Sequence, residues 1–186
     1  MTPTERAVAT VAIQQVLYRY CRAMDRMDAE LTLSCFEPDA ALRYGGLYVG
    51  SPAGFVDWLW PIHAAMVGHS HQVANVLVDL DGEPGTAVSE AYVTVTLRAV
   101  SADGDVVDLT GKGRYLDSWR GDGDAWRIAQ RTYVSDLSAV AAVVPTAYPV
   151  AMTPVPSAPR VVSTRDLDDP SYTLSSWLPG ARSGDR

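Results

Sequence analysis

The stretch TAVSEAYVTVTLRAVS, residues 86–101, decides the fold class of this chain. Apolar and polar side chains alternate along most of it, which is the period of a strand with one buried face. The segments 71–80, 106–120 and 124–137 show the same period. DGEPG, ADGD and GDGD separate the four segments and favour tight reversals of the chain. The sequence therefore predicts a meander of four long antiparallel strands.

The region before the meander has the period of helices. Thr2, Pro3 and Glu5 fit an N-cap, a first-turn proline and the acceptor of a capping box. A buried helical face is then predicted by the spacing of Ile13, Val16, Leu17, Tyr20 and Met24. Asp25 falls at the edge of this face, about 100° from Met24. We expect a first helix that ends near Asp25.

Two more helices and a hairpin complete this region. Asp28 is placed to cap a short second helix, and Ser51 to cap a third over 51–67, which Pro61 would kink or break. Between these helices, ALRYGGLYVG (41–50) predicts a hairpin with Gly45-Gly46 at its tip. Helices followed by long antiparallel strands predict an α+β fold.

The end of the chain differs in composition from the rest. Five prolines between 145 and 159 oppose regular helix or a central strand. We expect one domain over 1–137 and an extended Pro-rich tail over 138–186, part of which contacts the body of the protein or a second copy.

Composition excludes several classes of protein. The net charge is −7 and Lys112 is the only lysine, so no basic patch for nucleic acid is expected. No apolar run reaches the roughly 18 residues of a membrane span, and the N-terminus lacks the features of a signal peptide. Cys21 and Cys35 are too few for a disulfide scaffold. We expect a soluble cytoplasmic protein without nucleic-acid or membrane partners.

HSHQVAN, residues 69–75, contains two of the three histidines. Alternate residues on a strand face the same way, so His69 and His71 have a spacing that suits a metal ion. A third ligand is missing near Asn75, and only the distant His63 or Asp79 could replace it. We therefore predict no metal, with His71 either a catalytic base or a structural residue and His69 at the rim or in the preceding turn.

Three strings resemble the SnoaL-like polyketide cyclases and scytalone dehydratase-like proteins of the nuclear-transport-factor-like superfamily. They are YRYCRAMDRMDAELTLSCFEPDA (18–40), HSHQVAN (69–75) and GRYLDSWRGDGDAWRIAQR (113–131). The resemblance covers residues 8 to about 137. It implies a cone in which a curved antiparallel sheet wraps around the N-terminal helices and leaves a mostly apolar pocket open at one end.

The resemblance also implies catalytic residues. Tyr20, Asp25, Tyr44 and His71 stand where the dehydratases have two tyrosines, an aspartate and the catalytic histidine. The departure is in AYVTVTLRA (91–99): those dehydratases have a second histidine or an aspartate there, and this chain offers only Thr94, Thr96 and Arg98.

The chemistry of these residues fits proton transfer. A carboxylate beside an imidazole orients it and favours its protonated form, and tyrosine hydroxyls can donate to a carbonyl oxygen. Two alternatives stay open, since Asp25 could instead be exposed and Tyr20 purely part of the core. On a straight helix Tyr20 and Asp25 point about 140° apart, whereas Tyr18 lies within about 20° of Asp25.

Further residues are candidates for binding substrate or for structure. The expected substrate-binding residues are Tyr18, Phe55, Trp58, Met66 and Asn75, the last because it has the parity of His71 on its strand. Arg114, Asp117 and Arg127 are expected to form cross-strand charge pairs. We expect Arg131 to be structural.

Together these features predict a cofactor-independent acid-base enzyme. Its substrate would be a small, apolar carbonyl compound of polyketide, terpenoid or steroid type, and its reaction a dehydration or cyclisation through an enolate. The alternatives are a ketosteroid-type isomerase, an epoxide hydrolase, and a non-catalytic binding or assembly subunit. We expect a homodimer or higher homo-oligomer.

Overall fold

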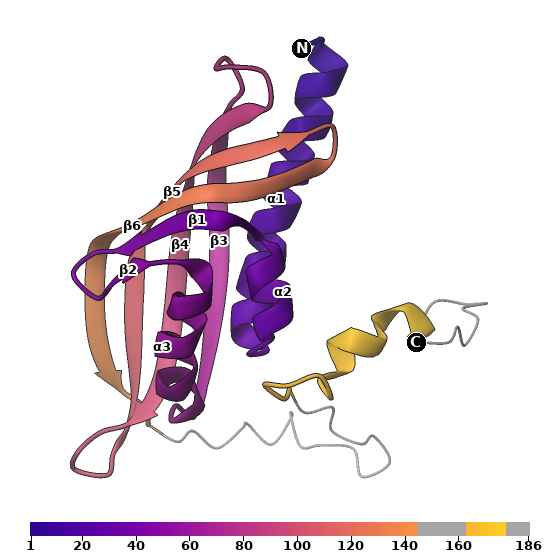
Figure 1. Cartoon of the computed structure of the whole chain (residues 1–186). Coiled ribbons are helices and arrows are strands. Elements are labelled where there is room, and N and C mark those ends of the chain that lie inside the picture. The colour runs from indigo at the N-terminus through magenta and orange to yellow at the C-terminus, as the bar shows by residue number, and fades with distance from the viewer. Residues whose placement is uncertain (145–162, 178–186) are drawn as a thin grey trace.

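A computed structural model describes residues 1–144 and 163–177 and shows a curved sheet around one long helix (Figure 1). The first elements are α1 (Pro3–Asp25), α2 (Ala29–Ser34), β1 (Phe36–Tyr44), β2 (Tyr48–Gly50) and α3 (Pro52–Ala64). The long strands β3 (Gly68–Asp79), β4 (Thr86–Val100), β5 (Val106–Asp122) and β6 (Ala125–Ala142) follow. The predicted α+β fold is confirmed.

The strands form one six-stranded sheet in the order β2-β1-β6-β5-β4-β3. The four long strands pair antiparallel with their sequence neighbours, as predicted. The short hairpin turns at Gly45-Gly46 and adds to the far edge, where β1 pairs in parallel with β6. This pairing sets Tyr44 beside Tyr133.

The N-terminal capping box predicted for α1 is present. The Thr2 hydroxyl accepts a hydrogen bond from the Glu5 amide, and the Glu5 carboxylate accepts one from the Thr2 amide at 2.7 Å. This reciprocal pair satisfies two amides that a helix start otherwise leaves without partners. At the other end the chain turns sharply at Met27, whose φ is 52°. Asp25 is therefore the last residue of the helix.

The core lies between α1 and the concave face of the sheet. The predicted apolar face of α1 is buried, and it belongs to one hydrophobic cluster with β4, β5 and β6. Side chains with at most 1% exposure in this cluster include Ile13, Leu17, Tyr20, Ala91, Trp119 and Ile128. Each large apolar side chain of this kind contributes about 1.5–3 kcal/mol on burial. The core fixes the position of α1, and so of the residues that it carries toward β3.

Three boundaries differ from the sequence prediction. β6 continues to Ala142, beyond the expected tail start at 138, because it pairs with β5 over that whole length. α3 passes through Pro61 and ends at Ala64, so Met66 lies outside the helix. Residues Pro170–Trp177 form a short 3₁₀ helix, η2, so this part of the tail is not extended. The five prolines at 145–159 lie outside the described residues.

None of the helices in the described part of the chain is long and apolar enough to cross a membrane.

Candidate active site

Asp25 and His71 form a hydrogen-bonded pair where the end of α1 meets β3. The Nδ1 atom of His71 lies 2.7 Å from Oδ1 of Asp25, and the backbone N–H of His71 donates to both carboxylate oxygens at 3.0 Å. A carboxylate only accepts hydrogen bonds, so Nδ1 carries the proton and Nε2 is the nitrogen left for other partners. Only 8% of the His71 side chain and 17% of the Asp25 side chain are exposed. The pair fixes one tautomer and one orientation of the ring.

His71 lines a cavity of about 200 Å³ inside the cone. The expected residues Tyr20, Tyr44, Phe55 and Trp58 also line it. The other lining residues are Met24, Leu47, Leu59, His63, Val93, Val95, Leu97, Tyr115 and Tyr133. The wall is thus mainly apolar and aromatic, and the side chains in it that carry polar groups are histidines, tyrosines and one tryptophan.

The β4 wall of the cavity is apolar. Val93, Val95 and Leu97 line it, whereas Thr94 and Thr96 alternate with them and take the other face of the strand. The cavity therefore receives valine and leucine side chains from β4, and neither Thr94 nor Thr96 lines it. Among the described lining residues, no carboxylate contacts the cavity.

Tyr20 and Tyr44 meet at the bottom of this site. Their hydroxyl oxygens are 2.8 Å apart, and both side chains are buried. Burial raises the pKa of Tyr20 well above its usual value, and the neighbouring Tyr44 and Tyr115 add to this. Burial likewise raises the pKa of Tyr44, although the Arg131 guanidinium opposes the shift. Both hydroxyls stay protonated at neutral pH, so the pair can donate a hydrogen bond.

Arg131 and Asp117 form an ion pair directly behind the tyrosines. The guanidinium donates two bonds to the carboxylate, at 2.8 and 2.7 Å, and both side chains are fully buried. The guanidinium also lies over the rings of Tyr20 and Tyr115, 4.3 and 4.0 Å from their centroids. Burial by itself would lower the pKa of Arg131, but the Asp117 carboxylate outweighs it and raises that pKa well above its usual value. A permanent positive charge therefore faces the phenols.

All three histidines of the chain gather at the other side of the site. The ring centroid of His63 lies 4.5 Å from that of His69 and 6.1 Å from that of His71. His69 donates from Nε2 to the carbonyl oxygen of Met24, at 2.8 Å. Burial lowers the pKa of His63 to about 3, with further contributions from His69, His71 and Arg165. Burial also lowers the pKa of His69, so both rings are neutral at pH 7.

Metal binding does not follow from this cluster. Within residues 1–144 and 163–177, no group of three or more His, Cys, Asp or Glu side chains is arranged to hold a metal ion. The Nδ1 atom of His71 is engaged by Asp25, and Nε2 of His69 by a backbone carbonyl. The geometry suits proton transfer through His71.

Comparison with known proteins identifies the family of the domain. The family model for SnoaL-like domains matches residues 5–132, which is more than half of the chain. The chain belongs to the SnoaL-like domain family. No functionally curated protein sequence matches it significantly.

Solved structures share the fold of this SnoaL-like domain. A proposed scytalone dehydratase from Novosphingobium aromaticivorans has a TM-score of 0.66 and 20% identity, covering 83% of this chain and 100% of its own. The hexachlorocyclohexane dehydrochlorinase LinA-type3 from Novosphingobium barchaimii has a TM-score of 0.65 and 14% identity, covering 80% and 100%. A proposed aromatic ring hydroxylase from Novosphingobium aromaticivorans has a TM-score of 0.61 and 27% identity, covering 77% and 96%.

The SnoaL-like domain brings together the four residues expected to be catalytic. Asp25 is engaged with His71 and only 17% of its side chain is exposed, so the alternative of an exposed carboxylate is wrong. The helix continues to Asp25, and Tyr20 points from another side of α1 to Tyr44. The 140° separation is therefore no obstacle, because Tyr20 lines the cavity itself, whereas Asp25 contacts His71 from outside the cavity wall. Whether these residues act in catalysis stays a prediction.

Three of the expected substrate-binding residues lie away from the cavity. Tyr18 is 45% exposed on the outer side of α1. Asn75 is exposed at a bulge in β3, where its φ of 48° and a shifted register interrupt the alternation. Met66 follows the end of α3, and its described polar contacts are those of its backbone: its N–H donates to the His63 carbonyl, and its carbonyl accepts from Arg165. Of the two places expected for His69, the turn before the strand is wrong, since His69 lies within β3.

Two groups of this site were missed at the sequence level. Asp117 was expected to pair with Arg114 and Arg127, but Arg131 is its partner, and Arg114 pairs with Asp136. The strand alternation could have found this, because Asp117 lies between the inward-facing Tyr115 and Trp119. No local pattern marks the approach of His63, which arises where the end of α3 meets β3.

Proposed function

We propose that this SnoaL-like domain is a cofactor-independent acid-base enzyme that acts on a small, largely apolar carbonyl compound. The observation that carries the proposal is the Asp25–His71 pair, with His71 in the wall of an apolar cavity. A histidine oriented by a carboxylate, with one nitrogen free, is a recurring arrangement for a general base. The preferred reaction is dehydration or cyclisation through an enolate.

In this reaction Nε2 of His71 takes a proton from the carbon next to the substrate carbonyl. Asp25 stabilises the imidazolium that forms, because its carboxylate is 2.7 Å from Nδ1. The Tyr20–Tyr44 pair donates to the carbonyl oxygen as negative charge develops there. In a dehydration, the imidazolium then returns the proton to the departing hydroxyl, which leaves as water while the double bond forms. In a cyclisation, the enolate carbon attacks a second carbonyl of the same molecule, and the proton goes to the new alkoxide.

The apolar β4 wall supports a mechanism in which one group moves both protons. With Val93, Val95 and Leu97 on that wall, the described lining residues offer no second carboxylic acid for the leaving group. His71 would then serve as base and afterwards as acid. The names of two related folds, a dehydratase and a dehydrochlorinase, both describe loss of a leaving group, which agrees with such chemistry.

The same observation favours isomerisation as a second candidate. A single base that removes a proton from one carbon and returns it to another shifts a double bond without a second acid. Epoxide hydrolysis has less support, because it needs carboxylates that converge on a water molecule. Besides Asp25, the sheet offers Asp117 and Glu90, but Asp117 is paired with Arg131 and Glu90 lies by Arg114. A non-catalytic role has less support as well, because the cavity is open to His71.

The test is proton exchange and turnover on a panel of small aromatic, terpenoid and steroid-like ketones. Exchange of the α-proton in D2O, followed by NMR, reports enolisation even where no product forms. His71→Ala and Asp25→Asn should each slow exchange and turnover at least ~100-fold, the low end of what a general base contributes. Asp39→Asn is the matched control, since this exposed aspartate pairs with Arg120 on the surface.

Circular dichroism and thermal unfolding establish that each variant is folded. Near-normal rates in both His71→Ala and Asp25→Asn on a compound that the wild-type protein turns over would end the proposal. Loss of rate in the Asp39→Asn control would show that the assay reports stability instead of catalysis.

A further inference from the structure

The described part of the C-terminal tail folds back onto the site region as a compact segment, Ser163–Thr173. Asp169 organises it: this carboxylate is 4% exposed and accepts hydrogen bonds from the amides of Thr164 and Ser171 and from the Ser171 hydroxyl. Together with Arg26, these bonds hold the pKa of Asp169 well below its usual range, the Ser171 hydroxyl having the largest effect. The segment is therefore built around a buried, ionised carboxylate.

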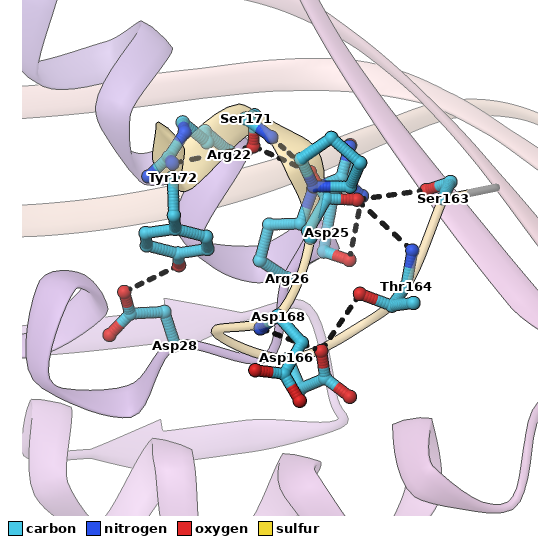
Figure 2. Close-up of polar contacts among 12 residues, drawn as sticks. Arg22, Asp25, Arg26, Asp28, Ser163, Thr164, Asp166, Asp168, Ser171 and Tyr172 are labelled. Carbon is cyan, nitrogen blue, oxygen red and sulfur yellow. Dashed lines mark hydrogen bonds and ion pairs between the residues drawn. The ribbon is translucent and has the colours of Figure 1, made fainter. Parts of the chain in front are cut away.

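One side of the segment is attached to the end of α1 (Figure 2). Nε of Arg26 lies 3.1 Å from Oδ1 of Asp169. Tyr172 donates to Asp28 at 2.6 Å, and the Arg22 guanidinium lies over the Tyr172 ring at 4.0 Å. Arg22, Arg26 and Asp28 lie within three residues of Asp25 in the sequence. The segment thus holds the same helix end that presents the Asp25 carboxylate to His71.

The other side is attached to the end of α3 through Arg165. Its guanidinium donates to the backbone oxygen of His63 at 2.7 Å and to that of Met66 at 2.8 Å. The last carbonyls of a helix have no partner within the helix, and a cation placed there is favourable. Arg165 therefore caps the end of α3 by binding the backbone carbonyl of His63, the residue whose ring contacts His69 and His71.

We propose that Arg165 is a positioning residue for the active site, which joins the end of α3 that carries His63 to the end of α1 that carries Asp25. Trp60, which donates to the backbone oxygen of Met27 at 3.1 Å, is a second link between the two helix ends. No residue of Ser163–Thr173 lines the cavity. The segment therefore acts from behind the histidines and does not cover the substrate site.

The charge of Arg165 has a second effect on the same cluster. Around His71 lie the Asp25 carboxylate from α1, the His69 ring from its own strand, the His63 ring from α3 and, behind these, the Arg165 guanidinium. After burial, which has the largest effect, Arg165 helps to lower the pKa of His63 and of His69. Burial keeps these two rings neutral and the Arg165 charge reinforces it, so a proton taken from substrate resides on His71.

The chain's three histidines make this testable without a substrate. In a protein labelled with ¹⁵N-histidine, every ring signal comes from this cluster, and the shifts report both environment and protonation. Arg165→Met keeps much of the side-chain length but removes the hydrogen-bond donors and the charge. It should move the signals of His63 and His71, and His63 should titrate at higher pH than in the wild type. Arg165→Lys keeps the charge but not the two-pronged contact, so His63 should titrate as in the wild type while its shift still moves.

Asp168→Asn is the control, because the substitution changes the charge of the same segment. Asp168 is exposed, and its side chain has no described contact with α3. Histidine spectra of Arg165→Met that superimpose on the wild type over the whole pH range would overturn the proposal.

The effect on turnover rests on the proposed function. Where a substrate is found, Arg165→Met should lower kcat ~10-fold or more with a smaller change in KM, because misplacement of catalytic groups by a fraction of an ångström is costly. An unchanged kcat would overturn the positioning role even if the spectra move. If no ketone is turned over by the wild type, the proposed function fails, and the histidine spectra still decide whether Arg165 positions the cluster.

Discussion

Replacing Arg131 with methionine tests how the ion pair behind the tyrosines supports the fold. The substitution keeps much of the side-chain length but removes both bonds to Asp117, at 2.8 and 2.7 Å, and leaves a fully buried carboxylate without its partner. Breaking a buried pair in this way costs ~3–5 kcal/mol. The lost contact with the rings of Tyr20 and Tyr115 adds to that cost. We therefore expect a drop at the upper end of this range.

The assay is urea unfolding followed by tryptophan fluorescence. With an m-value of ~2 kcal/mol/M, a loss of ~5 kcal/mol moves the urea midpoint down by ~2.5 M. Arg114→Met is the matched control, because Arg114 makes the same two-pronged contact with Asp136 at 3.0 Å but on the partly exposed face of the sheet. A pair of that kind is worth only about 0.2–1 kcal/mol.

The double variant Arg131→Met/Asp117→Leu separates two explanations. If the cost of Arg131→Met is that of an unpaired buried charge, removing the carboxylate as well should restore most of the lost stability. If Arg131→Met costs no more than Arg114→Met, the pair does not support the fold and our reasoning about burial is wrong. A double variant less stable than Arg131→Met alone would also contradict it.

Two further predictions concern pH and backbone conformation. His63 has its pKa lowered from 6.5 to about 3 in the folded protein, so between these values only the unfolded chain takes up its proton, and stability must fall as pH falls. His63→Gln should flatten the pH dependence of the unfolding midpoint between pH 6.5 and 3, and an unchanged slope would contradict this. Asn75→Ala should lower the free energy of unfolding by about 1–2 kcal/mol, because alanine tolerates the left-handed φ of 48° less well, whereas Asn75→Gly should not. Turnover should be unchanged in both Asn75 variants. A rate loss in a folded variant would show that Asn75 contributes to the active site, contrary to its exposed position.

The sequence was sufficient to predict the elements and much of the site. The spacing of apolar side chains and the residues that favour turns and caps are local properties of the sequence. The four long strands and the capping box of α1 could therefore be predicted directly. The positions of Asp25 and His71 followed from resemblance, and the hydrogen bond between them needed the three-dimensional structure. Asn75 was misplaced because strict alternation was assumed through a strand that contains a bulge.

The contacts that the sequence did not reveal are those made between elements distant along the chain. Asp117 and Arg131 face each other across β5 and β6, in a register that shifts just beyond them, between Ser118 and Trp119. His63 approaches His69 only because α3 ends where β3 starts. Arg165 reaches His63 across about a hundred positions of the sequence. Local propensity carries no information about such approaches, and physical reasoning needs the topology first.

The bulge at Asn75 has a consequence for how this strand can vary. Because one extra residue resets the alternation, His71 and Val73 before it and Val76, Val78 and Leu80 after it all have reduced exposure on the inner side. The strand therefore consists of two halves whose alternation is offset by one residue: the first carries His69 and His71, and the second packs Val76 and Val78 against the core. A substitution in the histidine half leaves the inward and outward alternation of the second half unchanged. Residues near the histidines can therefore change without turning core side chains outward. The residue at which the alternation shifts is Asn75, whose side chain is exposed to solvent.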